Sequence, residues 1–217
     1  MSHNQIPVED CGEPLVDVAV EGGLLIGPPP ETPLTEPDYR WVRRTVYEKL
    51  LRVQENLPRG LSLRLYEGLR SAAVQHRLFE EEKARVAIAH PRFTPRQVHL
   101  EASLLIAPPV HFDGTPNIPP HSTGGAVDVE IVDESGSVIE FGMEAKDWVR
   151  VDARFCETRH EDLTPEARAN RLMLCERMEA EGFVNYVREW WHYSYGDRYW
   201  AWMSGAPKAI YGPVSRP

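Results

Sequence analysis

Cysteine is scarce in this sequence. The 217 residues contain three cysteines, Cys11, Cys156 and Cys175, and no CxxC pair. An odd number without a framework spacing argues against a disulfide-stabilised domain, and the missing CxxC argues against a thiolate zinc site. We therefore predict free thiols in a reducing compartment, with Cys175 as a small buried residue of a helix.

Long hydrophobic runs are absent as well. The stretch from Leu104 to Val110 is among the longest, and it is far shorter than the about 20 apolar residues that span a bilayer. The N-terminal sequence MSHNQIPVEDCGEPL lacks the basic start and apolar run of a signal peptide. We therefore expect a cytoplasmic location.

Positive charge is also limited, with 24 Lys and Arg against 33 Asp and Glu and a net charge of −9. This balance argues against nucleic acid or an anionic membrane as the main partner. The chain is 42% hydrophobic, so it can bury a sizeable core, and its length suits one domain. Pro, Gly and Glu are frequent near the N-terminus, which predicts an irregular arm over 1–34, with a partly disordered tail as the alternative, and a single domain over 35–217.

Apolar periodicity and turn residues predict the elements of that domain. Helices are expected from Thr35 to the break at Leu57-Pro58, and over 71–89, 94–106 and 164–182. Strands are expected over 61–65, 126–132, 138–141 and 183–191. The Pro- and Gly-rich stretch 107–124 is expected to be a loop. Because helices and strands do not alternate as in βαβ units, the predicted class is α+β, with a central antiparallel sheet and flanking helices.

Two segments carry side chains suited to metal chemistry. The first, HSTGGAVD, runs from His121 to Asp128, and the second, EWWH, runs from Glu189 to His192. A catalytic zinc takes three N or O ligands from the protein and keeps one position open for water. His121, Asp128 and His192 meet that count, and Asp128 lies on the strand face opposite three aliphatic residues, where a buried carboxylate needs a partner. These residues are the predicted zinc ligands.

Glu189 is the spare carboxylate of this group. A carboxylate beside a zinc-activated water can take its proton and return it to a leaving amine. On a regular strand Glu189 and His192 would face opposite ways, so we predict a turn or bulge at Trp190-Trp191. Each residue alone also has a simpler interpretation. A lone histidine is more often a structural residue than a metal ligand, and a tryptophan pair more often packs in a core than contributes to a site.

The two segments together resemble the D-alanyl-D-alanine dipeptidases, the VanX-type family of zinc D,D-peptidases. The matching motifs are His-x6-Asp and Glu-x-x-His, and YEGLR at 66–70, NRL at 170–172 and EGF at 181–183 are also similar. The resemblance covers about residues 60 to 196. It implies the zinc D,D-peptidase fold of VanX and hedgehog type and one zinc ion on the three ligands named above. It also implies Glu189 as general base and acid, and Arg70 as the group that stabilises the tetrahedral intermediate.

The sequence departs from that family at the substrate-binding positions. The family has a serine two residues before the first histidine, where this chain has Pro119, which offers neither a hydroxyl nor a backbone N–H. Ser122 or Thr123 are the candidates to take its place at the substrate carboxylate. The family also has an aspartate near the substrate amine, for which Asp147 is the nearest match.

The function that this resemblance implies is hydrolysis of D-alanyl-D-alanine, or a close D,D-dipeptide, by metal-bound water, in cell wall biogenesis or degradation. The small dipeptide is then the partner that we expect. One alternative keeps the fold but acts as a D,D- or L,D-carboxypeptidase on peptidoglycan peptides. Another is a non-enzymatic binding module stabilised by zinc, which would need neither Glu189 nor Arg70.

Overall fold

A computed structural model describes residues 3–28, 30 and 38–217. The α-helices are α1 (Val18–Glu21), α2 (Arg44–Glu55), α3 (Ala72–Ala89), α4 (Pro95–Ala102), α5 (Pro165–Ala180) and α6 (Arg198–Ser204). The strands are β1 (Leu15–Asp17), β2 (Leu25–Ile26), β3 (Trp41–Arg43), β4 (Ser62–Glu67), β5 (Ala126–Val132), β6 (Val184–Asn185) and β7 (His192–Ser194). Short 3-10 helices include η1 (His3–Gln5), η4 (Pro120–Thr123) and η6 (Ala153–Cys156).

A five-stranded sheet with the order β2-β4-β5-β7-β6 forms the centre of the molecule. Three of its four strand pairs are antiparallel, whereas β2 runs parallel to β4 at one edge. A separate antiparallel pair joins β1 to β3. The α+β class predicted from the sequence is confirmed, with one parallel edge pair that the sequence did not indicate.

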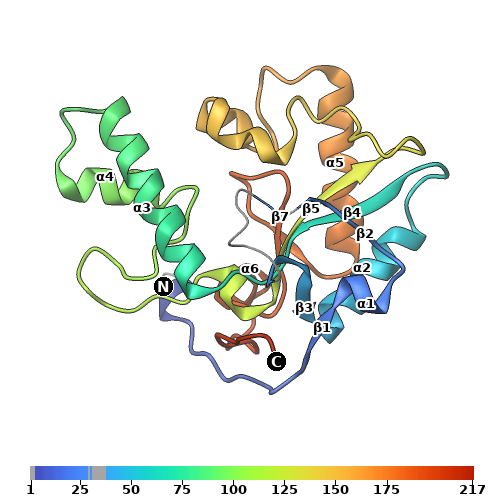
Figure 1. The fold of residues 1–217 in the computed structure, drawn as a ribbon, viewed down its shortest axis with the longest axis horizontal. Helices are drawn as coiled ribbons and strands as arrows, with labels where there is room; N and C mark the ends of the chain where they lie inside the picture. The colour runs from blue at the N-terminus through green and yellow to red at the C-terminus, as the bar shows by residue number, and fades with distance from the viewer. Residues whose placement is uncertain (1–2, 29, 31–37) are drawn as a thin grey trace.

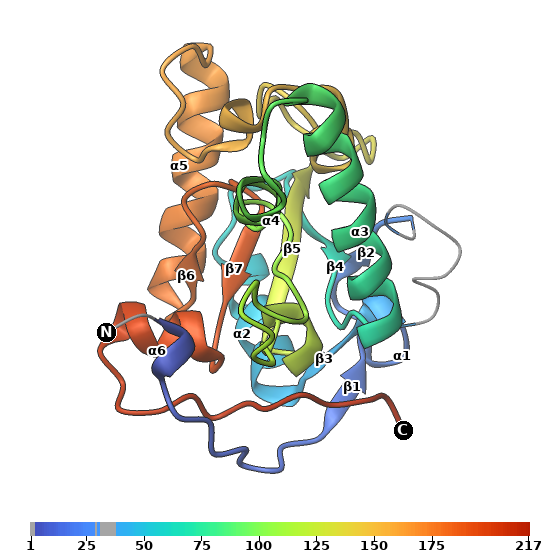
Figure 2. The same ribbon diagram turned by 90° about the vertical axis from the view of Figure 1, so that its left-hand side faces the viewer.

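Helices cover both faces of this sheet, with α3 and α4 on one side and α2 on the other (Figures 1 and 2). The alternating residues Val127, Val129 and Ile131 of β5 are fully buried in the main hydrophobic core, which includes Leu50 of α2 and Leu174 of α5. The intervening carboxylates point to the opposite face, towards α3 and α4. One face of β5 therefore builds the core, and the other is available for a polar site.

The starts of three predicted helices agree with their capping residues. The hydroxyls of Ser71, Thr94 and Thr164 accept hydrogen bonds from backbone N–H groups in the first turns of α3, α4 and α5. The helix expected from Thr35 is different: its first residues lie outside the described residues, and α2 begins only at Arg44. Residues 41–43 instead form β3, because the backbone there pairs with β1.

Two predicted strands are shorter than expected. Residues 138–141 contribute only an isolated bridge from Val138 to Val132. The stretch 183–191 contains only the two residues of β6 before it turns. Aromatic and β-branched residues suit any buried environment and not strands alone. The length of each strand is therefore set by the strands that pair with it in the fold.

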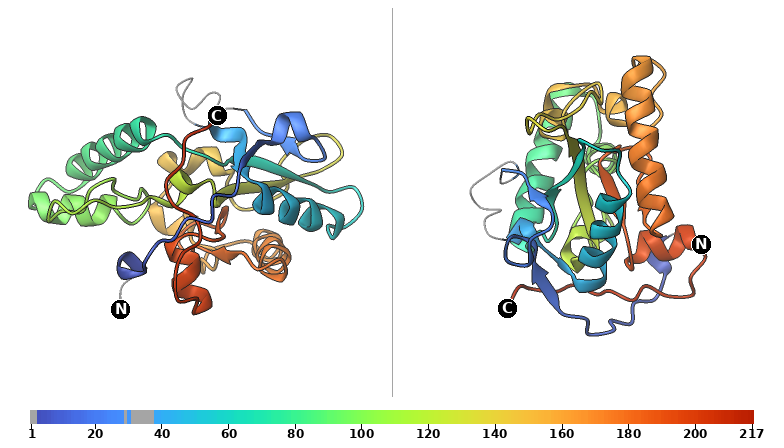
Figure 3. Two further views of the ribbon diagram at one scale, coloured as in Figure 1. Left: turned by 90° about the horizontal axis from the view of Figure 1, so that it is seen from below. Right: turned by 90° about the vertical axis from the view of Figure 1, so that its right-hand side faces the viewer.

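The N-terminal residues are more regular than the predicted arm over 1–34, since they supply β1, α1 and β2. The predicted boundary between residues 34 and 35 lies outside the described residues. Residues 7–11 run beside the C-terminal segment, where the backbone N–H of Glu9 donates to the carbonyl of Ala209 over 3.0 Å (Figures 2 and 3). Both segments thus pack on one end of the domain.

Candidate metal centre and catalytic site

A sharp turn brings His121 to the start of β5. Gly124 ends η4 in the left-handed region with φ of 69°, which favours glycine. At Gly125 a Cβ atom would stand 2.4 Å from the backbone oxygen of Tyr195, so only glycine fits there. The two glycines therefore allow η4 to turn directly into β5, with His121 close to the strand that carries Asp128.

Strand register places Asp128 and His192 side by side. They are direct partners in the antiparallel pair of β5 and β7, so their side chains leave the same face of the sheet. On the other neighbour, β4, the partner of Asp128 is Glu67. Three polar residues from separate parts of the chain thus form a row across the sheet.

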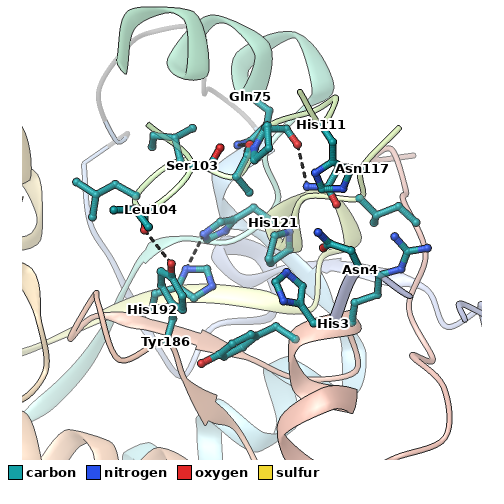
Figure 4. Close-up of a pocket in the computed structure, with 18 of the residues that line it drawn as sticks. His3, Asn4, Gln75, Ser103, Leu104, His111, Asn117, His121, Tyr186 and His192 are labelled. Atoms are coloured by element: carbon teal, nitrogen blue, oxygen red, sulfur yellow. Dashed lines mark hydrogen bonds between the residues drawn. The ribbon is translucent and has the colours of Figure 1, made fainter. Parts of the chain in front are cut away.

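The three predicted ligands converge on one point, and their side chains are buried (Figure 4). His192 Nδ1 lies 2.9 Å from Asp128 Oδ1 and 3.1 Å from His121 Nε2, and His121 Nε2 lies 3.4 Å from Asp128 Oδ1. Tetrahedral zinc ligands with bonds of about 2.1 Å lie roughly 3.4 Å from one another. The observed separations therefore suit a small ion bound by two nitrogens and one oxygen.

The tautomer of His121 also suits a metal ligand. Its Nδ1 atom lies 2.8 Å from the carbonyl oxygen of Gly68, which can only accept a hydrogen bond. Nδ1 must therefore carry the proton, and Nε2 directs its lone pair at the cluster. A ligating histidine is commonly fixed in this way by a carbonyl on its far nitrogen.

The electrostatics of the cluster keep a negative charge at its centre. Burial raises the pKa of Asp128, but the facing imidazoles outweigh burial and hold the pKa of this carboxyl below its ordinary value. Burial and the Arg70 charge lower the pKa of His121, but the Asp128 and Glu67 carboxylates together outweigh them, so the net pKa is raised. The Asp128 carboxylate is thus ionised, as a ligand of a cation must be.

Glu189 approaches the same cluster from a turn. Its Oε2 atom lies 3.8 Å from His192 Nδ1, and its side chain is largely buried. The backbone N–H of His192 donates to the Glu189 carbonyl over 3.2 Å, which closes a turn across Trp190 and Trp191. The predicted turn is confirmed. Trp190 is fully buried and its ring stacks on that of Phe141, with the ring centroids 4.1 Å apart, as expected for a core indole.

Arg70 lines the same cavity and is held by two neighbours. Its Nε and Nη2 donate to the carboxylate of Glu67, the first over 2.8 Å, and Nη1 donates to Gln75 Oε1 over 3.1 Å. The backbone N–H of Arg70 also donates to the carbonyl of His121 over 3.2 Å. A surface salt bridge, the usual role of an isolated arginine, does not account for Arg70, because Arg70 is buried beside the predicted metal ligands.

A cavity of about 830 Å³ opens over the cluster. The cavity is lined by the three predicted ligands, by Glu189 and Arg70, and by Trp191 and Tyr186. Its outer part is lined by α4, by the loop before η4 and by η1, which brings the N-terminal His3 and Asn4 to the cavity (Figure 4). No pattern in the sequence indicated that η1 would lie at this position.

The predicted substrate-binding residues lie elsewhere. The described residues that line the cavity do not include Ser122, Thr123 or Asp147. The hydroxyls of Ser122 and Thr123 donate to the carbonyls of Pro119 and Pro120, over 2.7 and 2.6 Å. Asp147 forms an ion pair with an exposed arginine three residues on. Local backbone bonding within η4 therefore takes the hydroxyls that we expected to face the substrate.

Two residues near the site escaped the sequence analysis. Glu67 and Gln75 orient the Arg70 guanidinium, and both are almost fully buried. Glu67 stands three residues before Arg70, and this spacing is the only signal that pointed to it.

No helix among the described residues is both long enough and apolar enough to cross a membrane.

Comparisons with known proteins find several that this chain is similar to. A D-alanyl-D-alanine dipeptidase of Synechocystis is 29% identical over 223 residues, which cover 91% of this chain and 88% of that protein. One of Escherichia coli is 33% identical over 73 residues, which cover 34% of this chain and 36% of that protein. Among solved structures, the LdcB LD-carboxypeptidase aligns over 92% of this chain and 77% of that chain, with 16% identity and a TM-score of 0.47.

The profile of one family, described as D-ala-D-ala dipeptidase, matches residues 61–204. That range is well over half of the chain and contains the three predicted ligands, Glu189 and Arg70. This chain therefore belongs to the D-ala-D-ala dipeptidase family of M15 peptidases, and it is a metallopeptidase.

Proposed function

We propose that the chain hydrolyses D-alanyl-D-alanine, or a close D,D-dipeptide, with one zinc ion held by His121, Asp128 and His192. The observation that carries this proposal is the convergence of two imidazole nitrogens and one carboxylate oxygen beside a further carboxylate, in a cavity. A site with these three ligands and a neighbouring acid suits catalysis, because a purely structural zinc site has four protein ligands.

A bound zinc ion supplies Lewis-acid chemistry, since it polarises a carbonyl and lowers the pKa of water to about 7. The residues of the chain then handle the proton. Glu189 reaches the cluster without being one of its three closest ligands, so its carboxylate can accept a proton from water at Oε2. It can return that proton to the amine that leaves, and such transfer contributes about 10²–10⁴-fold to rate.

Arg70 is suited to stabilise the oxygen that becomes negative as the amide is attacked. A guanidinium keeps its charge at all working pH values and donates in a rigid fork. Glu67 and Gln75 fix the orientation of that fork, so little reorganisation is needed when charge develops. The preorganised cation is the reason that we assign Arg70 to the oxyanion and not to a diffuse electrostatic role.

The size of the cavity favours a second candidate. Its volume of about 830 Å³ lies in the upper part of the range of about 300–1,000 Å³ that holds drug-sized ligands. A dipeptide alone does not fill such a space. A D,D- or L,D-carboxypeptidase that removes the last residue of a peptidoglycan peptide is therefore the alternative to test.

The deciding experiment compares substrates and one variant. Zinc-loaded protein is assayed on D-alanyl-D-alanine, on L,L-dipeptides and on peptidoglycan peptides of three to five residues. We expect cleavage of the D,D-dipeptide, and a loss of about 10²–10⁴-fold in kcat for Glu189→Gln with unchanged zinc content. Glu55→Gln, at an exposed carboxylate that does not line the cavity, is the matched control.

Two results would change this assignment. Cleavage of the longer peptides, with the dipeptide left intact, would establish the carboxypeptidase instead. Full activity of zinc-replete Glu189→Gln would remove Glu189 from the mechanism.

A further inference from the structure

The turn that carries Glu189 and His192 is held by a buried amide. Asn185, the last residue of β6, is 5% exposed. Its Nδ2 atom donates to the carbonyl of Glu189 and to the carbonyl of His192, each over 3.1 Å. One side chain thus bridges the backbone of the two residues whose side chains meet at the metal cluster.

A second side chain fixes this amide. The Thr158 hydroxyl donates to Asn185 Oδ1 over 2.6 Å, and Thr158 is 3% exposed. The two carbonyls can only accept, so the NH₂ end of Asn185 must face them and its oxygen must face Thr158. The backbone N–H of Thr158 also donates to the carbonyl of Val187, inside the same turn, over 3.0 Å. Thr158 therefore contacts both the amide and the turn.

The segment around Thr158 is itself held in place. Arg171 of α5 is fully buried and donates to the carbonyls of Phe155 and Glu157, over 3.0 and 2.6 Å. The backbone N–H of Trp190 donates to the carbonyl of Cys156 over 3.0 Å. A connected series of bonds thus runs from α5, through η6 and Thr158, to Asn185 and the catalytic turn.

We propose that Asn185 and Thr158 are positioning residues that set the separation between the Glu189 carboxylate and His192. This inference rests on the proposed function, because it concerns the same two residues. Neither Asn185 nor Thr158 is among the described residues that line the cavity, so both act through the backbone of the turn. Reacting groups tolerate little displacement, and an error of about 1 Å can cost 10²-fold in rate.

The test uses a pair of substitutions at Thr158. Thr158→Val keeps the shape but loses the hydroxyl, and Thr158→Ser keeps the hydroxyl but loses a methyl group. For Thr158→Val we expect kcat to fall by roughly ten-fold, with KM within about two-fold of the wild type, because the proton-transfer geometry suffers more than substrate binding. Thr158→Ser should restore most of kcat.

A change in Asn185 should be more severe. Asn185→Asp places a carboxylate against two carbonyl oxygens and removes both donors. We expect a kcat about 10²-fold below that of the wild type and weaker zinc binding, because His192 is displaced as well. Zinc affinity is measured by competition with a chromophoric chelator, independently of activity. If Asn185→Asp does not fold, the Thr158 pair alone decides the question.

A control separates positioning from general stability. Thr45→Val also removes a hydroxyl, one that lies on α2 and donates to Glu13 Oε2 over 3.1 Å, and Thr45 does not line the cavity. It should lower the melting temperature without changing kcat. A Thr158→Val protein that melts earlier but keeps wild-type kcat and zinc affinity would overturn the proposal.

Failure of the proposed function gives a different pattern. If the wild type cleaves none of the peptides, the function is wrong, and zinc affinity still tests the positioning of His192. In that case weaker zinc binding by Asn185→Asp supports the positioning role, and unchanged binding refutes it.

Discussion

Zinc should stabilise the fold strongly, and this can be measured without any substrate. The three ligands come from η4, β5 and β7, and they are only 4%, 4% and 7% exposed. An unfolded chain does not hold residues 121, 128 and 192 together, so the ion binds the folded state in preference. Binding free energy then adds directly to the free energy of unfolding.

The magnitude follows from mass action. At a free zinc concentration about 1,000 times the dissociation constant, the gain is about 4.1 kcal/mol. In a domain of about 150–250 residues, 1 kcal/mol shifts the melting temperature by about 2–4 °C. We therefore expect the melting temperature to rise by roughly 8–16 °C when zinc is added to metal-free protein.

Differential scanning calorimetry with and without zinc measures this rise in the melting temperature. Asp128→Asn should lose most of the rise, because it removes the charged ligand at the centre of the cluster. His90→Gln, at an exposed histidine at the end of α3, should keep all of it. If zinc leaves the melting temperature of the wild type unchanged, or if Asp128→Asn responds as the wild type does, the three residues do not form the metal site.

Three further outcomes can be checked separately. Arg70→Lys should lose nearly as much kcat as Arg70→Ala, about 10²–10³-fold, because lysine keeps the charge but not the fork, and a full rate with lysine would contradict the oxyanion role. Gly125→Ala should lower the free energy of unfolding by about 1–3 kcal/mol, measured by urea denaturation, because its Cβ would meet the Tyr195 backbone 2.4 Å away. In native protein at pH 8, iodoacetamide followed by mass spectrometry should label the exposed Cys11 and leave Cys156 unlabelled, because burial raises the pKa of the Cys156 thiol to about 12.

Local sequence patterns predicted most of the elements and the candidate metal ligands. The alternation of Val127, Val129 and Ile131 with acidic residues predicted β5, since side chains on a strand leave opposite faces in turn. The pairs Thr94-Pro95 and Thr164-Pro165 lie at the starts of α4 and α5, because a threonine hydroxyl can satisfy the first backbone N–H groups of a helix and proline suits its first position. Glu189 and His192 are three residues apart and would face opposite ways on a regular strand, so their spacing predicted a turn.

Tertiary structure alone decided how these pieces meet. Asp128 and His192 are neighbours through strand register, which depends on the packing of the whole sheet and not on either segment. The same packing made residues 41–43 a strand within a predicted helix, and it reduced residues 138–141 to one bridge. Long-range pairing of this kind has no signature in a short stretch of sequence.

At the substrate-binding positions, too, the sequence predicted the residue types and the tertiary structure decided their hydrogen-bond partners. The sequence identified hydroxyls at Ser122 and Thr123, but the 3-10 turn of η4 uses both of them for its own carbonyls. The spacing of Glu67 and Arg70 does not by itself show that the carboxylate orients the guanidinium, and no pattern shows that Asn185 bridges two carbonyls of the catalytic turn. Residue types fix which chemistry is possible, whereas hydrogen-bond partners in the folded chain fix which groups remain to perform it.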